Sequence, residues 1–172
     1  MLSGYNFTND VRHVLALARI ESHRLRHEYV GTEHLLLAYT NEEVPAAVRL
    51  LGALNIDHGK LRAEIDQRVQ SGTSPRNSAH QLPYTSRAKK CLENAMTVAR
   101  EAGHNFVGIE HLLAGIIREE KGIAAQVLAM HGASERAVFA VAGLPHAPAQ
   151  PEHKRRTVLA RLRAWLRGKH RS

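Results

Sequence analysis

The sequence predicts an all-α protein in which one four-helix unit occurs twice as a pseudo-twofold pair, followed by a C-terminal basic amphipathic helix. Three observations lead to this prediction. Residues 7–66 align without a gap with residues 84–143, and fifteen of the sixty positions are identical, where unrelated sequences would share roughly three or four. Apolar residues recur at helical spacing between capping residues and breaks, and no segment is typical of a strand. A basic segment with the same spacing follows three prolines.

The first copy contains signals for four helices. Thr8, after Phe7, is typical of an N-cap, because its hydroxyl can accept a hydrogen bond from a free amide of the first helical turn. Gly31 and Thr32 are expected to open a second helix, and Pro45 suits the first turn of a third. Residues 56–69 supply the fourth helix.

The second copy repeats these signals from Tyr84 to Ala142, with Thr85 in the place of Thr8. Gly103 is expected to end its first helix, since glycine readily takes the left-handed conformation that closes many helices. The copies agree best over residues 29–36, YVGTEHLL, and residues 106–113, FVGIEHLL.

The chain therefore divides into five expected parts. The two repeats occupy residues 1–70 and 83–143, and a polar Gly/Pro/Ser linker at 71–82 joins them. Residues 144–153 form a proline-rich spacer, and residues 154–172 form the basic amphipathic tail.

Charge is distributed unevenly between the repeats and the tail. The net charge is +8, but residues 152–172 hold eight Lys/Arg and one acid, which leaves the first 151 residues at +1. The repeats are therefore not a basic nucleic-acid-binding surface.

A single cysteine, Cys91, excludes an internal disulfide, and we expect it to be a small buried apolar residue. Residues 1–10 lack the pattern of a signal peptide and no apolar run could span a bilayer, so the expected compartment is the cytoplasm.

Each copy has Phe-Thr or Tyr-Thr at its first helix start, followed by Gly-Thr-Glu-His-Leu-Leu or Gly-Ile-Glu-His-Leu-Leu. This paired pattern resembles the N-terminal repeat of Clp ATPases over residues 5–143. The resemblance implies an eight-helix domain that receives adaptors and substrates ahead of an ATPase ring. No Walker A loop occurs in this chain. The implied protein is a stand-alone, non-enzymatic binding module without a cofactor. Its implied partners are Clp ATPase or protease subunits, adaptor proteins, and unfolded or tagged protein substrates.

The same resemblance implies four ligand-binding residues: Thr8, Glu33, Thr85 and Glu110. In some relatives the equivalent glutamates bind the guanidinium of phosphoarginine, while the threonines and helix-terminal amides hold its phosphate, which agrees with the chemistry of both groups. The alternative is that Glu33 and Glu110 only stabilise the helix starts through the helix dipole.

Three departures from the family pattern suggest that the two sites differ. Ile109 replaces the hydroxyl residue kept at Thr32, and Arg26 stands where the second copy has Gly103. Val44 and Pro45 likewise replace a glycine-bearing turn, which the second copy keeps at residues 121–122.

Four histidines lie near the glutamates: His27, His34, His104 and His111. A metal site is not expected, because adjacent Glu and His residues project about 100° apart on a helix, whereas a zinc helix uses ligands at i and i+4. We expect packed, hydrogen-bonded histidines instead. No nucleophile has a base at a recognisable spacing, so catalysis is not expected either.

The tail supplies the main alternative function. Its apolar residues follow helical spacing between arginines, which suits an anionic membrane surface, a groove on a partner, phosphates of a nucleic acid, or a fold back onto the repeats. The candidate contacts in the tail are Arg155, Arg156, Arg161, Arg163, Trp165 and Arg167.

Overall fold

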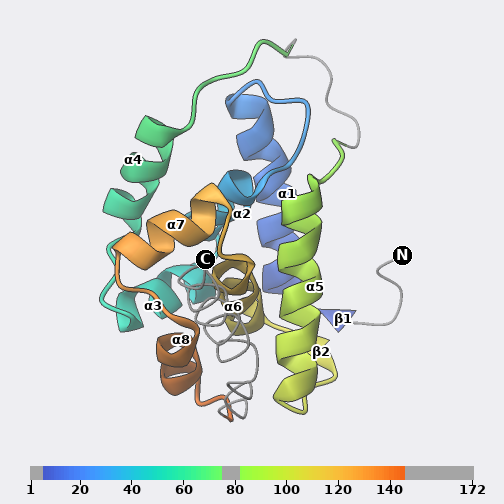
Figure 1. The fold of residues 1–172 in the computed structure, drawn as a ribbon, viewed down its shortest axis with the longest axis vertical. Helices are drawn as coiled ribbons and strands as arrows, with labels where there is room; N and C mark the ends of the chain where they lie inside the picture. Colours follow the sequence, from blue (N-terminus) through green and yellow to red (C-terminus); the bar gives the residue numbers. More distant parts are fainter. Residues whose placement is uncertain (1–5, 75–81, 146–172) are drawn as a thin grey trace, which may run out of the picture.

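The computed structural model describes residues 6–74 and 82–145, and these ranges contain eight helices (Figure 1). Each helix of the first repeat has a counterpart 77 positions later in the chain, and α1 and α5 correspond residue for residue. The duplicated all-α fold predicted from the sequence is confirmed. The helices are α1 (Asn9–Arg24), α2 (Thr32–Tyr39), α3 (Pro45–Ala53), α4 (His58–Arg68), α5 (Ser86–Glu101), α6 (Ile109–Glu119), α7 (Ile123–Met130) and α8 (Glu135–Ala142).

The predicted caps are present at both long helices. Thr8 Oγ1 accepts a hydrogen bond from the Val11 amide at 3.4 Å, and Thr85 Oγ1 accepts one from the Ala88 amide at 3.1 Å. Each threonine keeps its hydroxyl hydrogen for another partner, because a hydroxyl both donates and accepts.

The expectation that no strand forms is wrong in one detail. β1 (Asn6–Phe7) pairs in parallel with β2 (Phe106–Val107), and Val30 forms an isolated parallel bridge with Tyr84. Such short segments are not recognisable from sequence, because two residues cannot display the alternation of a strand.

These pairings connect each repeat to the other. The Thr8 amide donates to Val107 O at 3.0 Å, and the Thr85 amide donates to Val30 O at 3.0 Å. The start of α1 is therefore fixed beside the start of α6, and the start of α5 beside the start of α2.

One apolar core runs through both repeats, with α2 and α6 at its centre (Figure 1). All eight residues of α2 are buried, which explains why this helix lacks a polar face. The Tyr39 hydroxyl donates to Ile109 O at 3.2 Å and so ties α2 to the first turn of α6. Cys91 is buried as expected, and burial raises the pKa of its thiol to about 12.

Arg26 takes the same backbone conformation as Gly103 despite its side chain. Its φ is 59°, against 74° for Gly103. The Arg26 side chain is held by Ser74 O, which accepts from Nε at 3.2 Å. The substitution therefore leaves the turn after the first helix unchanged.

Several predicted segments lie outside the described residues. They are residues 75–81 of the linker, residues 146–153 of the spacer, and the whole tail with its six candidate contacts. In the described ranges, no helix is both long and apolar enough to cross a membrane.

Candidate functional site

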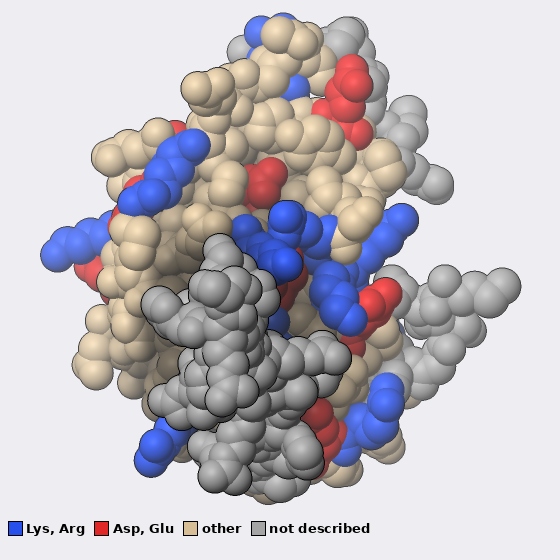
Figure 2. All heavy atoms as spheres, in the orientation of Figure 1, with Lys and Arg blue, Asp and Glu red and all other residues tan. Residues whose placement is uncertain are grey.

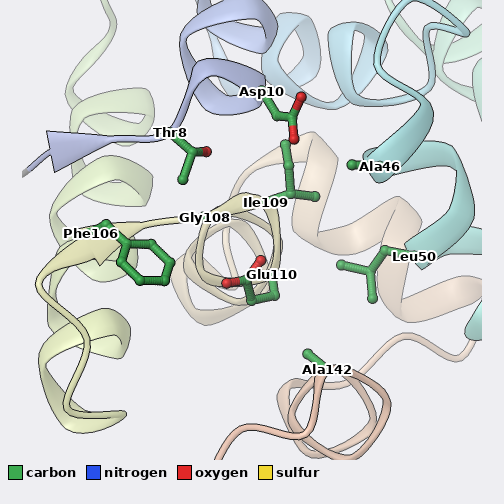
Figure 3. A pocket seen from close by; sticks show the side chains of 9 residues that line it. All are labelled: Thr8, Asp10, Ala46, Leu50, Phe106, Gly108, Ile109, Glu110 and Ala142. Carbon is green, nitrogen blue, oxygen red and sulfur yellow. The ribbon is translucent and has the colours of Figure 1, made fainter.

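Two clefts of similar size lie at the starts of the paired helices. The Thr8 cleft has a volume of about 410 Å³ and is lined by Thr8, Asp10, Ala46, Leu50, Phe106, Gly108, Ile109, Glu110 and Ala142 (Figure 3). The Thr85 cleft has a volume of about 430 Å³ and is lined by Tyr29, Gly31, Thr32, Glu33, Thr85, Ser86, Arg87, Lys121, Gly122 and Ile123.

Each cleft is built from both repeats. Thr8 comes from the first repeat and meets Glu110 from the second, whereas Thr85 comes from the second and meets Glu33 from the first. The sequence singled out these four residues but did not pair them. The structure brings them together in crossed pairs because the short parallel bridges connect the two repeats.

The two glutamates fold back over the glycine that precedes their helix. A side chain added at Gly31 would collide with the Glu33 carboxylate, and one added at Gly108 would collide with that of Glu110. Glycine is therefore required here for a close approach and not for its backbone angles, since φ is −96° at both positions. The carboxylates are held over the helix starts, where the dipole favours negative charge.

A chain of hydrogen bonds supports the helix start beneath Glu33. The Gly31 amide donates to His34 Nδ1 at 2.8 Å, so His34 Nε2 carries the ring proton and donates to His27 Nδ1 at 2.9 Å. His27 Nε2 then donates to Gln70 O at 2.9 Å. The three bonds require both rings to be neutral.

The second repeat has the same arrangement. The Gly108 amide donates to His111 Nδ1 at 2.8 Å, and His111 Nε2 lies 3.0 Å from His104 Nδ1. The prediction of packed, hydrogen-bonded histidines is confirmed for both pairs.

Burial keeps the inner histidines neutral. Burial, with smaller contributions from His27 and Arg24, lowers the pKa of His34 from 6.5 to about 3. Burial also lowers the pKa of His111. A second proton on His34 would oppose the Gly31 amide directly.

The argument that adjacent Glu and His side chains must diverge is wrong. Potential ligand atoms of His27, Glu33 and His34 lie within 4.8 Å of one another, as do those of His104, Glu110 and His111. A flexible glutamate can fold back, so the 100° between backbone positions does not fix where its carboxylate lies. Even so, these triads suit a metal poorly, because the glycine amide occupies Nδ1 of the inner histidine and leaves the ring proton on Nε2.

Sequence reasoning missed the aromatic and charged residues of the clefts. The Tyr29 ring stacks on His27 with centroids 5.3 Å apart, and the Phe106 ring stacks on His104 at 5.0 Å. Asp10 and Arg87 occupy equivalent positions in the two clefts. The alignment of the repeats already placed an acid opposite a base at these positions, but only the structure shows that both positions line a cleft.

Comparison with known proteins gives a consistent result. The model of the Clp repeat (R) N-terminal domain matches residues 6–131. The chain is 41% identical over 128 residues to chaperone protein ClpB of Oceanobacillus iheyensis. It is 42% identical over 128 residues to the negative regulator of genetic competence ClpC/MecB of Bacillus subtilis. Each match covers 74% of this chain but only 16% and 15% of those relatives, respectively.

Solved structures support the fold. The N-terminal domain of the chaperone ClpD from Arabidopsis thaliana superposes with a TM-score of 0.60 at 23% identity, over 80% of this chain and 92% of that domain. The Hsp104 N-terminal domain from Candida albicans gives a TM-score of 0.62 at 14% identity, over 80% and 89% of the two chains.

Proposed function

Because the chain belongs to the family of Clp repeat N-terminal domains, we propose that it is a non-catalytic protein-binding module of the Clp protease and chaperone system. Its proposed partners are adaptor proteins, Clp ATPase or protease subunits, and unfolded or tagged substrates. The observation that carries the proposal is the pair of matching clefts, each with a carboxylate, a free hydroxyl hydrogen and an aromatic ring.

The chemistry of the clefts suits short segments of protein chain. A carboxylate accepts the paired donors of a guanidinium, and a threonine hydroxyl beside a helix start can donate to an anion. Phosphoarginine carries both a guanidinium and an anionic phosphate. We therefore extend the proposal to proteins that carry phosphoarginine, and its candidate contacts are Thr8, Glu33, Thr85 and Glu110.

Titration calorimetry with free phosphoarginine tests this extension. Heat of binding is expected from the unmodified chain, and the double variant Glu33→Ala, Glu110→Ala should lose it, since a hydrogen bond to a charged group contributes about 1.5–3 kcal/mol. The exposed residues Glu42 and Glu93 line neither cleft, so a Glu42→Ala, Glu93→Ala variant should keep the heat. An unmodified protein that gives no heat would rule out phosphoarginine as the ligand.

We further propose that residues 1–70 and 83–143 act as one binding unit in the cytoplasm and that residues 154–172 are an accessory element. The tail's charge suits an anionic membrane surface or a nucleic acid. Deletion of residues 152–172 separates binding of membranes or nucleic acids by the tail from the proposed function of the repeats. Capture of Clp proteins should survive the deletion, while any binding to lipid vesicles or DNA should disappear. Loss of Clp capture on deletion would instead make the tail the functional element.

A further inference from the structure

The two clefts carry opposite charge at equivalent positions. Asp10 in the Thr8 cleft corresponds to Arg87 in the Thr85 cleft, and both are exposed. Lys121 in the Thr85 cleft corresponds to Val44, which is buried. A change at two matched positions alters the charge that a ligand meets, while the threonine, the glutamate and the preceding glycine stay the same.

The Thr8 cleft is acidic and partly apolar. Its charged lining residues within the described ranges are Asp10 and Glu110, and none is a lysine or arginine. Figure 3 shows these two side chains on different walls, with Ala46, Leu50 and Ala142 on the sides formed by α3 and α8. Two carboxylates beside aliphatic groups suit a long cationic side chain, whose methylene groups pack on the apolar wall while its charged end meets the acids.

The Thr85 cleft combines one acid with two cations. Arg87 Nη1 lies 2.9 Å from Glu119 Oε1, yet the Arg87 side chain remains 54% exposed and faces the cleft with Lys121. Thr32 adds a hydroxyl group where the Thr8 cleft has Ile109. These donors suit an anionic group, with Glu33 left to accept from a cation attached to it.

The arginine in the first turn of α5 does not stabilise that helix. The first turn of α5 contains no acid and begins with Ser86 and Arg87, although the helix dipole disfavours positive charge at an N-terminus by about 0.3–1 kcal/mol. Figure 2 shows lysine and arginine side chains gathered over the region that α5 occupies in Figure 1. A local arrangement that opposes helix stability is often found at a functional site.

We infer that the two clefts bind chemically different groups. The Thr85 cleft takes an anionic group, and the Thr8 cleft takes an unmodified lysine or arginine side chain of the partner protein. This inference rests on the proposed function, because it assigns ligand classes to the same two clefts. A partner would then be recognised by a pair of opposite charges and not by the same group twice.

Nuclear magnetic resonance on the full chain tests the assignment with two separate probes, inorganic phosphate and N-acetyl-arginine amide. Phosphate should shift the amide resonances of Thr32 and Glu33 and leave that of Glu110 in place. The arginine probe should shift the resonances of Ile109 and Glu110. Both responses should weaken with added salt, since exposed charges are screened.

Charge reversal provides the matched variants. Arg87→Asp should weaken phosphate binding by about tenfold at low salt, and Asp10→Arg should weaken binding of the arginine probe by a similar factor. Lys60→Asp makes the same charge change as Arg87→Asp at an exposed position on α4 that lines neither cleft, so it should change both affinities by less than about twofold.

Equal responses of the two clefts to either probe, a phosphate shift at Glu110, or no effect of either reversal would overturn the inference. The proposed function would survive that result if capture of Clp proteins still depended on the clefts. If capture did not depend on them, the proposed function would fail whatever the probes showed.

Discussion

A Gly115→Ala variant is expected to be about 2–3 kcal/mol less stable than the unmodified protein, because the added methyl group has no room. A Cβ at Gly115 would lie 2.5 Å from Cys91 O and 2.6 Å from the Ala95 amide nitrogen. Both atoms belong to the backbone of α5, which cannot rotate away as a side chain can. The helices α5 and α6 would have to separate in the centre of the core.

Urea unfolding followed by circular dichroism measures this loss, and Gly52→Ala is the matched control. Apart from the local backbone of α3 itself, nothing lies within 4 Å of a Cβ added at Gly52, so alanine there should raise stability by about 0.5–1 kcal/mol through helix propensity alone. A Gly115→Ala protein as stable as the unmodified one would contradict the close approach of the two helices.

A His34→Leu variant is expected to lose about 2–4 kcal/mol, because two polar groups lose their partner in a buried region. The Gly31 amide would have no acceptor, and His27 Nδ1 would have no donor. Leucine fills a similar volume, so the loss reports the hydrogen bonds more than a cavity. The same urea unfolding measures it.

The exposed residue His13 supplies the control for that substitution. Its side chain is 44% exposed and reaches only Glu43, at 3.6 Å, so His13→Leu should change stability by less than about 0.5 kcal/mol. Equal losses of stability from His13→Leu and His34→Leu would contradict a stabilising role for the buried hydrogen-bond chain.

The pH dependence of stability gives a second measure of the same residue. His34 has a folded pKa of about 3 against 6.5 for a free histidine, so between these values the unfolded chain binds a proton that the folded chain does not. The contribution of neutral His34 to the free energy of unfolding is therefore complete above pH 6.5. It is lost as the pH falls toward 3, by up to about 1.4 kcal/mol per pH unit. His111 acts in the same direction. Unfolding free energies at pH 7, 6 and 5 should thus fall more steeply for the unmodified protein than for His34→Leu.

Local signals were enough to predict the helices and their caps. The Thr8 and Thr85 caps, the helix start at Thr32 and the left-handed Gly103 follow from interactions within a few residues of the chain. The duplication of the fold followed from the alignment of the two repeats. Each of these features depends only on sequence neighbours or on comparison of the chain with itself.

The crossed pairing of the site could not be obtained in this way. Thr8 meets Glu110 only because β1 pairs with β2, and that contact joins residues about 100 positions apart through segments too short to recognise. The Glu33 carboxylate folds back on Gly31 by rotation of its own side chain, which residue spacing does not determine. The charge difference between Asp10 and Arg87 is visible in the sequence, but only the structure shows that both residues line clefts.

The most direct test of the central claim, that partners bind in the two crossed clefts, uses the double variant Gly31→Ala, Gly108→Ala. The added methyl groups would displace the carboxylates of Glu33 and Glu110, which are flexible, so the fold should persist. The unmodified protein should capture Clp subunits or adaptors, identified by mass spectrometry, from an extract of the cells that make it, and the folded double variant should not. Recovery of the same Clp proteins in equal amounts by the double variant would contradict the account.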